Sequence, residues 1–486
     1  MGEPTPPPEA PPSLREPALA LPFGLLAAVL LFDLARLGRS AFQILRTPYS
    51  RDYGEGCVLA MVQLLAERGS YFSTFEDYPF VHGNYPPVFP LLNLPAYLLL
   101  GPTLFVPRLL SVLATIGLVA VMAALVRRET GDGRLAGAFA LLLLAPWFVQ
   151  TWAALGRVDM LACLLSLAGL HLFHRFGPES RGRFAAYACF FLAFFTKQNA
   201  LLAPAALVLG LALDAATRRH ARRVLVEIAL PLLVLFGLLC ALTGGQAYEH
   251  LVPYTAAADY EWDRMRRAYR DFLTLIGPLL AFILPALVVF RKVAGTGSTA
   301  SYLFYWLLNL AGLVTIAKAG AAQNYFIEPY VATLTLAALL VGHAMRTSAV
   351  AGRAWPAYLL VVATVATVAD MERGRARLPP QEPREFAELY AAVRDTSGPI
   401  LSEDLSALVL NRKPVLVEPF GALLISRKGL LNPDRIVADC RAGRFALVVS
   451  DFRLREIAGM DSCLSERYEI WKRLGPYELL RPRPAL

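Results

Sequence analysis

Apolar runs that return about every thirty residues constrain this chain more than any other feature, because each is near the length that crosses a bilayer as a helix. Of the 486 residues, 56% are hydrophobic and only 17% are charged, too little polar surface for a soluble protein of this length. The runs cover residues 17–37, 86–100, 104–126, 135–149, 157–174, 184–196, 198–213, 224–242, 272–290, 301–317, 325–344 and 354–370. The sequence therefore predicts a polytopic all-α membrane protein.

The loops between these runs fall into two kinds. One kind is rich in arginine and lysine, which the positive-inside rule assigns to the cytoplasm; it contains Arg127, Arg128, Arg134, Arg175, Arg181, Arg183, Arg218, Arg219, Arg222, Arg223, Arg291, Lys292, Arg346 and Arg353. If the N-terminus is also cytoplasmic, the short, proline-containing run 86–100 cannot be a full crossing. We therefore predict about eleven crossings and one short re-entrant helix on the outer side.

Three further segments complete the predicted organisation. Residues 1–16 are proline-rich and expected to be disordered, and residues 38–85 form the first outer loop of a membrane domain that spans 17–370. Within that loop, the helical pattern at 55–68 is expected to lie along the membrane interface. Residues 371–486 alternate strand-like and helical stretches, which predicts a small extracytoplasmic α/β domain.

The charge and cysteine patterns narrow the classes of function. The net charge of +9 comes from basic clusters between apolar runs, so it indicates membrane topology and not nucleic-acid binding. The six cysteines stand singly, without the spacing of a zinc site. Cys440 and Cys463 lie in the C-terminal domain, where a disulfide and two free thiols are both open.

Acidic side chains near the outer face are the first candidates for chemistry, because ionisable groups at membrane depth are costly. Asp52 and Glu55 follow the first span, three residues apart, and can act as a base and its partner or as metal ligands. The alternative is a solvated loop with Glu55 near a helix N-terminus. Asp159 begins a later apolar run, where it is either functional or a helix-end charge.

Polar and basic side chains cluster on the same predicted face. Amides, aromatic rings and cations there suit sugar hydroxyls and phosphate; the alternatives are turn residues, snorkelling lysines and interface anchors. The candidates are His82, Asn84, Tyr85, Lys197, Gln198, Arg264, Arg267, Lys318, Asn324, Tyr325 and Glu328.

These features together resemble a known superfamily. A first-loop acid, a short helix led by Tyr85-Pro86-Pro87, Asp159 at a helix start and the Thr196–Asn199 corner resemble the GT-C glycosyltransferases. More narrowly, the chain resembles the bacterial branch related to protein O-mannosyltransferases and to the aminoarabinose transferases of lipid A. The resemblance covers about residues 18–345, and the tail resembles periplasmic α/β domains of some members.

The resemblance implies that a sugar moves, with inversion, from a polyprenyl-phosphate donor to a glycolipid, polysaccharide or protein acceptor. The site would lie on the outer face of the bacterial cytoplasmic membrane. Asp52 matches the first-loop acid, with Glu55 as its near alternative, and Asp159 matches the second acid. Some members hold a divalent metal ion between such acids, for which Asp52 and Asp159 are the ligands here. Lys197, Lys318 and the arginines at 264–270 are the expected contacts of the donor phosphate.

Two other classes of function remain as hypotheses. A flippase or transporter for a lipid-linked glycan is expected to have inverted repeats and polar residues at the membrane midplane, whereas the acids here sit at helix ends. A lipid-linked glycan ligase or polymerase uses similar substrates, but its large outer loop usually comes late in the chain. Here the large loop comes first.

Overall fold

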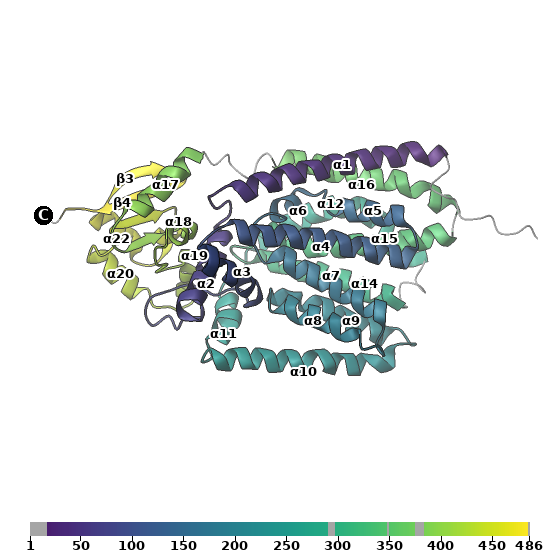
Figure 1. Ribbon diagram of the computed structural model, residues 1–486, viewed down its shortest axis with the longest axis horizontal. Helices are drawn as coiled ribbons and strands as arrows, with labels where there is room; N and C mark the ends of the chain where they lie inside the picture. The colour runs from purple at the N-terminus through teal and green to yellow at the C-terminus, as the bar shows by residue number, and fades with distance from the viewer. Residues whose placement is uncertain (1–16, 290–296, 348, 375–382, 485–486) are drawn as a thin grey trace, which may run out of the picture.

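The computed structural model describes residues 17–289, 297–347, 349–374 and 383–484. The expected disorder of residues 1–16 therefore lies outside the described residues. The helices up to residue 374 run mostly along the long axis of the molecule, and the C-terminal residues form a cap at one end (Figure 1). The helices of the bundle and its loops are α1 Pro17–Arg46, α2 Tyr53–Arg68, α3 Val88–Leu100, α4 Phe105–Thr130, α5 Gly133–Leu142, α6 Trp147–Trp152, α7 Asp159–Phe176, α8 Arg183–Phe194, α9 Leu202–Leu213, α10 Arg218–Leu242, α11 Gln246–Glu249, α12 Trp262–Val289, α14 Gly297–Gly312, α15 Ile327–Thr347 and α16 Ala349–Gly374.

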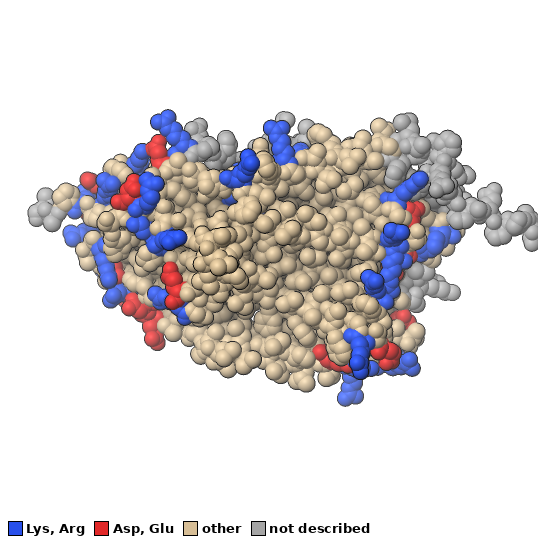
Figure 2. Space-filling model, in the orientation of Figure 1, with Lys and Arg blue, Asp and Glu red and all other residues tan. Residues whose placement is uncertain are grey.

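Length and hydropathy identify membrane helices in this bundle. Five of the described segments are long and apolar enough to cross a membrane: Phe105–Thr130, Arg218–Leu242, Trp262–Val289, Gly297–Ala317 and Gln323–Thr347. Several other apolar helices are shorter, so the predicted number of crossings stays a prediction. Charged side chains gather toward the two ends of the molecule and leave a largely uncharged band between them (Figure 2). Such a band is the surface that a bilayer requires.

The basic loops meet at the end of the bundle that faces away from the C-terminal domain (Figure 1). Arg346 donates to the carbonyl of Glu129, whose carboxylate accepts from Ser298 at 2.7 Å. Asp214 accepts from the Gly297 amide at 2.8 Å. For the loops that the structure describes, the predicted division into two sides matches how they group in space; Arg291 and Lys292 lie outside the described residues.

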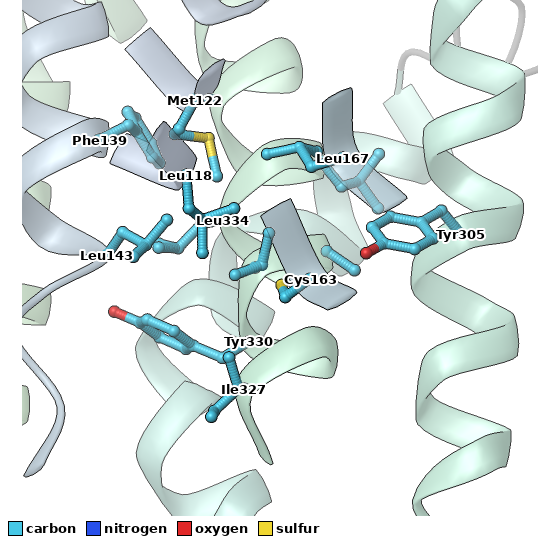
Figure 3. Close-up of a cluster of buried hydrophobic side chains, with 14 of the residues drawn as sticks. Leu118, Met122, Phe139, Leu143, Cys163, Leu167, Tyr305, Ile327, Tyr330 and Leu334 are labelled. Atoms are coloured by element: carbon cyan, nitrogen blue, oxygen red, sulfur yellow. The ribbon is translucent and has the colours of Figure 1, made fainter. Parts of the chain in front are cut away.

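The core of the bundle lies where α4, α5, α7, α14 and α15 meet (Figure 3). Leu118 and Met122 from α4 pack with Leu334 from α15, and all three are fully buried. The Tyr330 hydroxyl donates to the Leu142 carbonyl at 2.9 Å, so this buried polar group is satisfied. By contrast, α10 exposes many apolar side chains, among them Leu230 and Leu233, as a lipid-facing helix does.

The C-terminal domain is a small α/β unit, as the alternating pattern predicts. Its sheet has the order β1-β2-β4-β3; β1 and β2 pair in parallel, and the other pairs are antiparallel. A disulfide joins Cys440 to Cys463, which decides the alternative that the sequence left open. The elements are α17 Pro383–Asp395, β1 Ile400–Ser402, α18 Leu405–Leu410, α19 Pro419–Arg427, α20 Asp434–Arg441, β2 Leu447–Ser450, α21 Arg453–Glu456, α22 Met460–Arg467, β3 Tyr468–Leu474 and β4 Tyr477–Pro482.

The first outer loop joins the domain to the bundle. Phe80 pairs with Val417 in a short parallel bridge, and the Glu418 amide donates to the Phe80 carbonyl at 2.8 Å. Helix α2 packs against α18, and its residues from Gly54 to Leu64 are all buried. The expectation that this helix lies along the membrane interface is therefore wrong, because the C-terminal domain covers the side that the interface would have covered.

Helix α12 begins about ten residues earlier than the apolar run that predicted it, at Trp262 instead of residue 272. Arg264 and Arg267 accordingly lie on the first turns of a helix and not in a loop. Periodicity marks only the apolar part of a helix, so a charged first segment is missed. The run 86–100 forms α3, of only 13 residues, and whether it is re-entrant stays a prediction.

Candidate active site

A cavity of about 320 Å³ lies where the end of the bundle, the first outer loop and the C-terminal domain meet. Segments far apart in the sequence contribute to it, because helix ends and connecting loops converge at this end of the bundle. The predicted residues that line it are Asp52, His82, Asn84, Tyr85, Lys197, Gln198, Lys318, Asn324 and Tyr325. Most of the polar residues expected on one face are thus brought together.

Asp52 is the most accessible of the three predicted catalytic acids, Asp52, Glu55 and Asp159. It caps the N-terminus of α2, where its carboxylate accepts from the Gly54 amide at 3.0 Å, and its side chain is 31% exposed. The same carboxylate is paired with the Arg157 guanidinium. A carboxylate that is both oriented and exposed to a cavity can accept a proton from a bound hydroxyl.

Asp159 lies beside the pair of Asp52 and Arg157, at the first position of α7, and is 4% exposed. Its Oδ1 accepts from Lys197 Nζ and from Asn324 Nδ2, each at 2.8 Å. These contacts bring the Lys197 corner and the loop before α15 together at Asp159. Asp159 holds the two segments in place and keeps Lys197 charged at the cavity wall.

Glu55 has a different environment from Asp52, although the two are one helical turn apart. Its side chain is fully buried and forms a two-pronged ion pair with Arg108, with both N–O distances at 2.8 Å. Its oxygens also accept from the amides of Arg51 and Gly156 at 2.9 and 2.8 Å. With its acceptor positions occupied and no place on the cavity wall, Glu55 is a structural anchor, so its assignment as a catalytic alternative is wrong.

Lys318 is a cation without an acid beside it. It lines the cavity between η3 (Leu313–Ala317) and η4 (Gln323–Phe326), half-buried, and burial lowers the pKa of its ammonium. Among the described residues, no acid pairs with this ammonium, whereas Lys197 and Arg157 each have a carboxylate partner. A desolvated and unpaired ammonium favours an anionic ligand.

Several other polar atoms on the wall are also unsatisfied. His82 Nδ1, Asn84 Oδ1 and Gln198 Oε1 are buried and have no hydrogen-bond partner within the described part of the chain. Buried polar atoms are nearly always paired, so a group of them around one cavity indicates a ligand rich in hydroxyls or amides.

His82 belongs to a histidine pair that supports the first outer loop. Its ring stacks on that of His250 with centroids 5.6 Å apart, and His250 bonds the Gly83 amide and the Ser73 carbonyl, both at 2.8 Å. Burial lowers the pKa of His82 to about 3 and that of His250 to about 4, so both rings are neutral at physiological pH. A neutral His82 can donate to or accept from a ligand, but it is not a charge partner.

Three of the predicted binding residues lie outside the cavity wall. Arg264 donates to the Lys318 carbonyl at 3.2 Å and thereby supports the loop from behind. Arg267 is exposed on α12. Glu328 lies inside the bundle on α15, where it accepts from the Tyr305 hydroxyl at 3.0 Å. These three side chains lie near the same end of the bundle as the cavity or inside the bundle, but none of them lines the cavity.

Arg157, Glu418, Phe420 and Arg453 are among the wall residues that sequence reasoning missed. Arg157 stands two positions before Asp159, at the start of an apolar run. The other three belong to the C-terminal domain, where no motif marked them. Phe420 packs against Gly320, whose backbone lies so close that an added Cβ would be 2.4 Å from the ring.

Glu418 links the C-terminal domain to the cavity wall. It accepts from the Tyr53 hydroxyl and from the amides of Phe420 and Gly421 at 3.1 and 2.7 Å. Burial raises the pKa of its carboxyl group. Because Tyr53 directly follows Asp52, this contact fixes the backbone that carries the candidate base.

Comparison with known proteins places this fold. No family model matches the chain, and no curated protein sequence matches it either. Solved structures do match. ArnT from Cupriavidus metallidurans in the apo state aligns with a TM-score of 0.60 and 14% identity, over 93% of this chain and 98% of ArnT.

Two further structures are similar. The same ArnT bound to undecaprenyl phosphate gives a TM-score of 0.59 at 14% identity, over 94% of this chain and 98% of that one. The oligosaccharyltransferase of Archaeoglobus fulgidus, tethered to an acceptor peptide, gives 0.57 at 13% identity, over 94% of this chain and 73% of that one. The expected resemblance to GT-C membrane glycosyltransferases is thus confirmed at the level of the fold.

Proposed function

We propose that this chain is a membrane glycosyltransferase that moves a hexosyl or pentosyl group from a polyprenyl-phosphate donor to an acceptor hydroxyl or amine. The observation that carries the proposal is the Lys318 ammonium: it is partly desolvated, has no acid partner among the described residues, and faces the same cavity as Asp52. A phosphate ester is the anion that such a cation suits, and Asp52 is the base that the reaction needs.

The reaction follows from these positions. Asp52 accepts the proton of an acceptor hydroxyl, whose oxygen attacks the anomeric carbon of the donor sugar. The bond between that carbon and the phosphate oxygen breaks, and the polyprenyl phosphate leaves with its charge held by Lys318. Attack opposite to the leaving group inverts the anomeric centre. The unsatisfied atoms of His82, Asn84 and Gln198 would bind sugar hydroxyls.

The fold neighbours support the donor class. One ArnT structure is bound to undecaprenyl phosphate, and an oligosaccharyltransferase AglB from Archaeoglobus fulgidus was solved with dolichol phosphate at a TM-score of 0.52. Both ligands are polyprenyl phosphates, so a site of the same kind fits the cavity of this chain. The acceptor in this proposal is a glycolipid, a polysaccharide or a protein.

We further propose that the cavity faces the extracytoplasmic side of a bacterial cytoplasmic membrane. The arginine-rich loops group at the opposite end, which the positive-inside rule assigns to the cytoplasm. The disulfide between Cys440 and Cys463 supports an oxidising compartment for the C-terminal domain.

Binding of undecaprenyl phosphate to the purified protein in nanodiscs, measured by native mass spectrometry, tests the donor site. We expect Lys318→Met to weaken binding at least about tenfold, the loss of one charge-assisted contact. Arg267→Met is the matched control, since it removes an exposed cation on α12 outside the cavity wall, and its affinity should equal that of the wild type. Undecaprenol, which lacks the phosphate, should bind wild type and Lys318→Met equally. Equal binding of the phosphate by both would refute the role of Lys318.

A further inference from the structure

We infer that the Arg157 guanidinium occupies the place between Asp52 and Asp159 that a divalent metal ion would need, so that this chain binds its donor without metal. The inference rests on the proposed function and adds to it the nature of the cation between the acids. Four observations support it. They are the contacts of Arg157, the space that Gly54 leaves, the hydrogen bonds already made by one oxygen of each acid, and the lack of a third His, Cys, Asp or Glu nearby among the described residues.

Arg157 connects the two acids directly. Its Nη1 pairs with Asp52 Oδ2, and its Nε lies 3.9 Å from Asp159 Oδ2. Its Nη2 donates to the Tyr85 hydroxyl at 2.9 Å, which fixes the plane of the guanidinium. The side chain is only 14% exposed, so the pairing is shielded from bulk water.

Gly54 provides the space that this arrangement needs. A Cβ added at Gly54 would lie 1.5 Å from Arg157 Nη1 and 2.3 Å from Cζ. A side chain at this position, in the first turn of α2, would therefore displace the guanidinium from the place that it occupies beside Asp52. The absence of a side chain at Gly54 thus makes room for the side chain of Arg157, about a hundred residues later in the sequence.

One oxygen of each acid is already occupied by hydrogen bonds from cations or amides. Asp159 Oδ1 already accepts from Lys197 and Asn324, and Asp52 Oδ2 accepts from Arg157 and the Gly54 amide. Mg²⁺ in proteins is usually held by one or two carboxylates together with waters and substrate phosphates. An ion between Asp52 and Asp159 would, however, be repelled by the fixed positive charges of Arg157 and Lys197. In the described ranges, no three His, Cys, Asp or Glu side chains group closely enough to hold a metal. The residues present do not fit a metal ion.

A guanidinium can stabilise the charge of the donor phosphate in place of a metal ion. It is charged at all relevant pH values, and its planar fork matches two phosphate oxygens. Arg157 Nε and Asp159 Oδ2 are both buried and have no hydrogen-bond partner within the described chain, so the fork retains free donor capacity in this state. An arriving donor phosphate would pair with Arg157, and Asp52 would then be free to accept the acceptor's proton.

Two measurements on the purified wild-type protein test this. Its metal content, by inductively coupled plasma mass spectrometry, should be well below one ion per chain. Its binding of undecaprenyl phosphate should be the same in EDTA and in excess Mg²⁺ or Mn²⁺. One bound ion per chain that is lost in Asp52→Asn, or binding that is lost in EDTA and restored by a divalent ion, would overturn the inference.

Variants provide the second arm of the test. Arg157→Gln should weaken undecaprenyl phosphate binding at least about tenfold, and Arg157→Lys, which keeps the charge without the fork, by less. Gly54→Ala should act like Arg157→Gln, while Arg267→Gln should bind as the wild type does. Thermal midpoints in detergent identify any variant that has failed to fold. Full binding by a folded Arg157→Gln would refute the role of Arg157.

If the wild type itself does not bind undecaprenyl phosphate, the proposed function fails, and the metal content still decides the inference.

Discussion

At the scale of single residues, burial separates two acids that the sequence places three positions apart. Asp52 caps α2 and is partly exposed to the cavity, while Glu55 points into the protein and pairs with Arg108. A helical turn rotates neighbouring side chains to different faces, so spacing alone could not assign their roles. The fully buried Arg108 also donates to the carbonyls of Ile44, Thr47 and Tyr49, so Glu55 is linked to the end of α1.

Glu55→Gln should therefore destabilise the fold. It leaves the buried guanidinium of Arg108 without its counter-charge, a loss of about 3–5 kcal/mol. The measurement is the thermal midpoint of the purified variant in detergent. The control is Glu67→Gln on the same helix, where the exposed acid accepts a hydrogen bond from Gln63, and its midpoint should stay near that of the wild type. A midpoint for Glu55→Gln equal to that of Glu67→Gln would contradict the anchoring role.

The sequence was sufficient to predict Asp52, Lys197, Lys318 and Asn324 as residues of one site, because polar groups at the ends of apolar helices are rare and conspicuous. It was insufficient for Arg157, since an arginine at a helix end is usually an interface anchor. It was also insufficient for Glu418, whose role depends on a contact between residues 365 positions apart. Non-local pairing of this kind leaves no local pattern.

At the scale of elements, helix α2 links the bundle to the C-terminal domain. It is buried between them, and the bond from Tyr53 to Glu418 closes the contact beside Asp52. The strand-like bridge between Phe80 and Val417 adds a second connection. The amphipathic pattern of α2 predicted a helix correctly, but it could not distinguish a membrane surface from a protein surface, because both cover apolar side chains.

Glu418→Ala should loosen this contact. It removes the acceptor of the Tyr53 hydroxyl and of two amides at the start of α19. Hydrogen–deuterium exchange should become faster in the first turn of α2 and in residues 416–425, with the bundle core unchanged. Glu456→Ala, which removes an exposed ion pair with Arg427 in the same domain, is the control and should leave exchange in α2 as it is. Unchanged exchange in Glu418→Ala would show that the contact does not hold α2.

Acidification should weaken the first outer loop. The pKa values of His82 and His250 are lowered to about 3 and about 4, below the ordinary value of 6.5 that applies in the unfolded chain. The unfolded state therefore binds more protons between pH 6.5 and about 4, and stability present above pH 6.5 is lost as the pH falls through this window. Thermal midpoints measured from pH 7 to pH 4.5 should fall more steeply for the wild type than for His82→Gln/His250→Gln. Parallel curves would contradict burial of neutral rings.

At the scale of the whole molecule, the separation of charge carries the account. Charged side chains gather toward the two ends of the molecule, with a largely uncharged band between them (Figure 2). The cavity with its acids and cations lies at the end that the C-terminal domain caps. Hydropathy and loop charge were enough to predict this arrangement, since the bilayer imposes it on any chain of this kind. The number of crossings stays a prediction, because several of the described apolar helices are shorter than a membrane span.

The central claim is that the cavity transfers one sugar from a lipid-linked donor. Mass spectrometry of surface glycans and glycolipids tests it most directly, in a deletion strain of the source organism complemented with wild type, Asp52→Asn or Glu67→Gln. We predict that the deletion removes a single sugar mass from one glycan, that wild type and Glu67→Gln restore it, and that Asp52→Asn does not although it is folded and present in the membrane. Full restoration by Asp52→Asn, or loss of a whole glycan with accumulation of its lipid-linked precursor, would contradict the account and favour a ligase or a flippase.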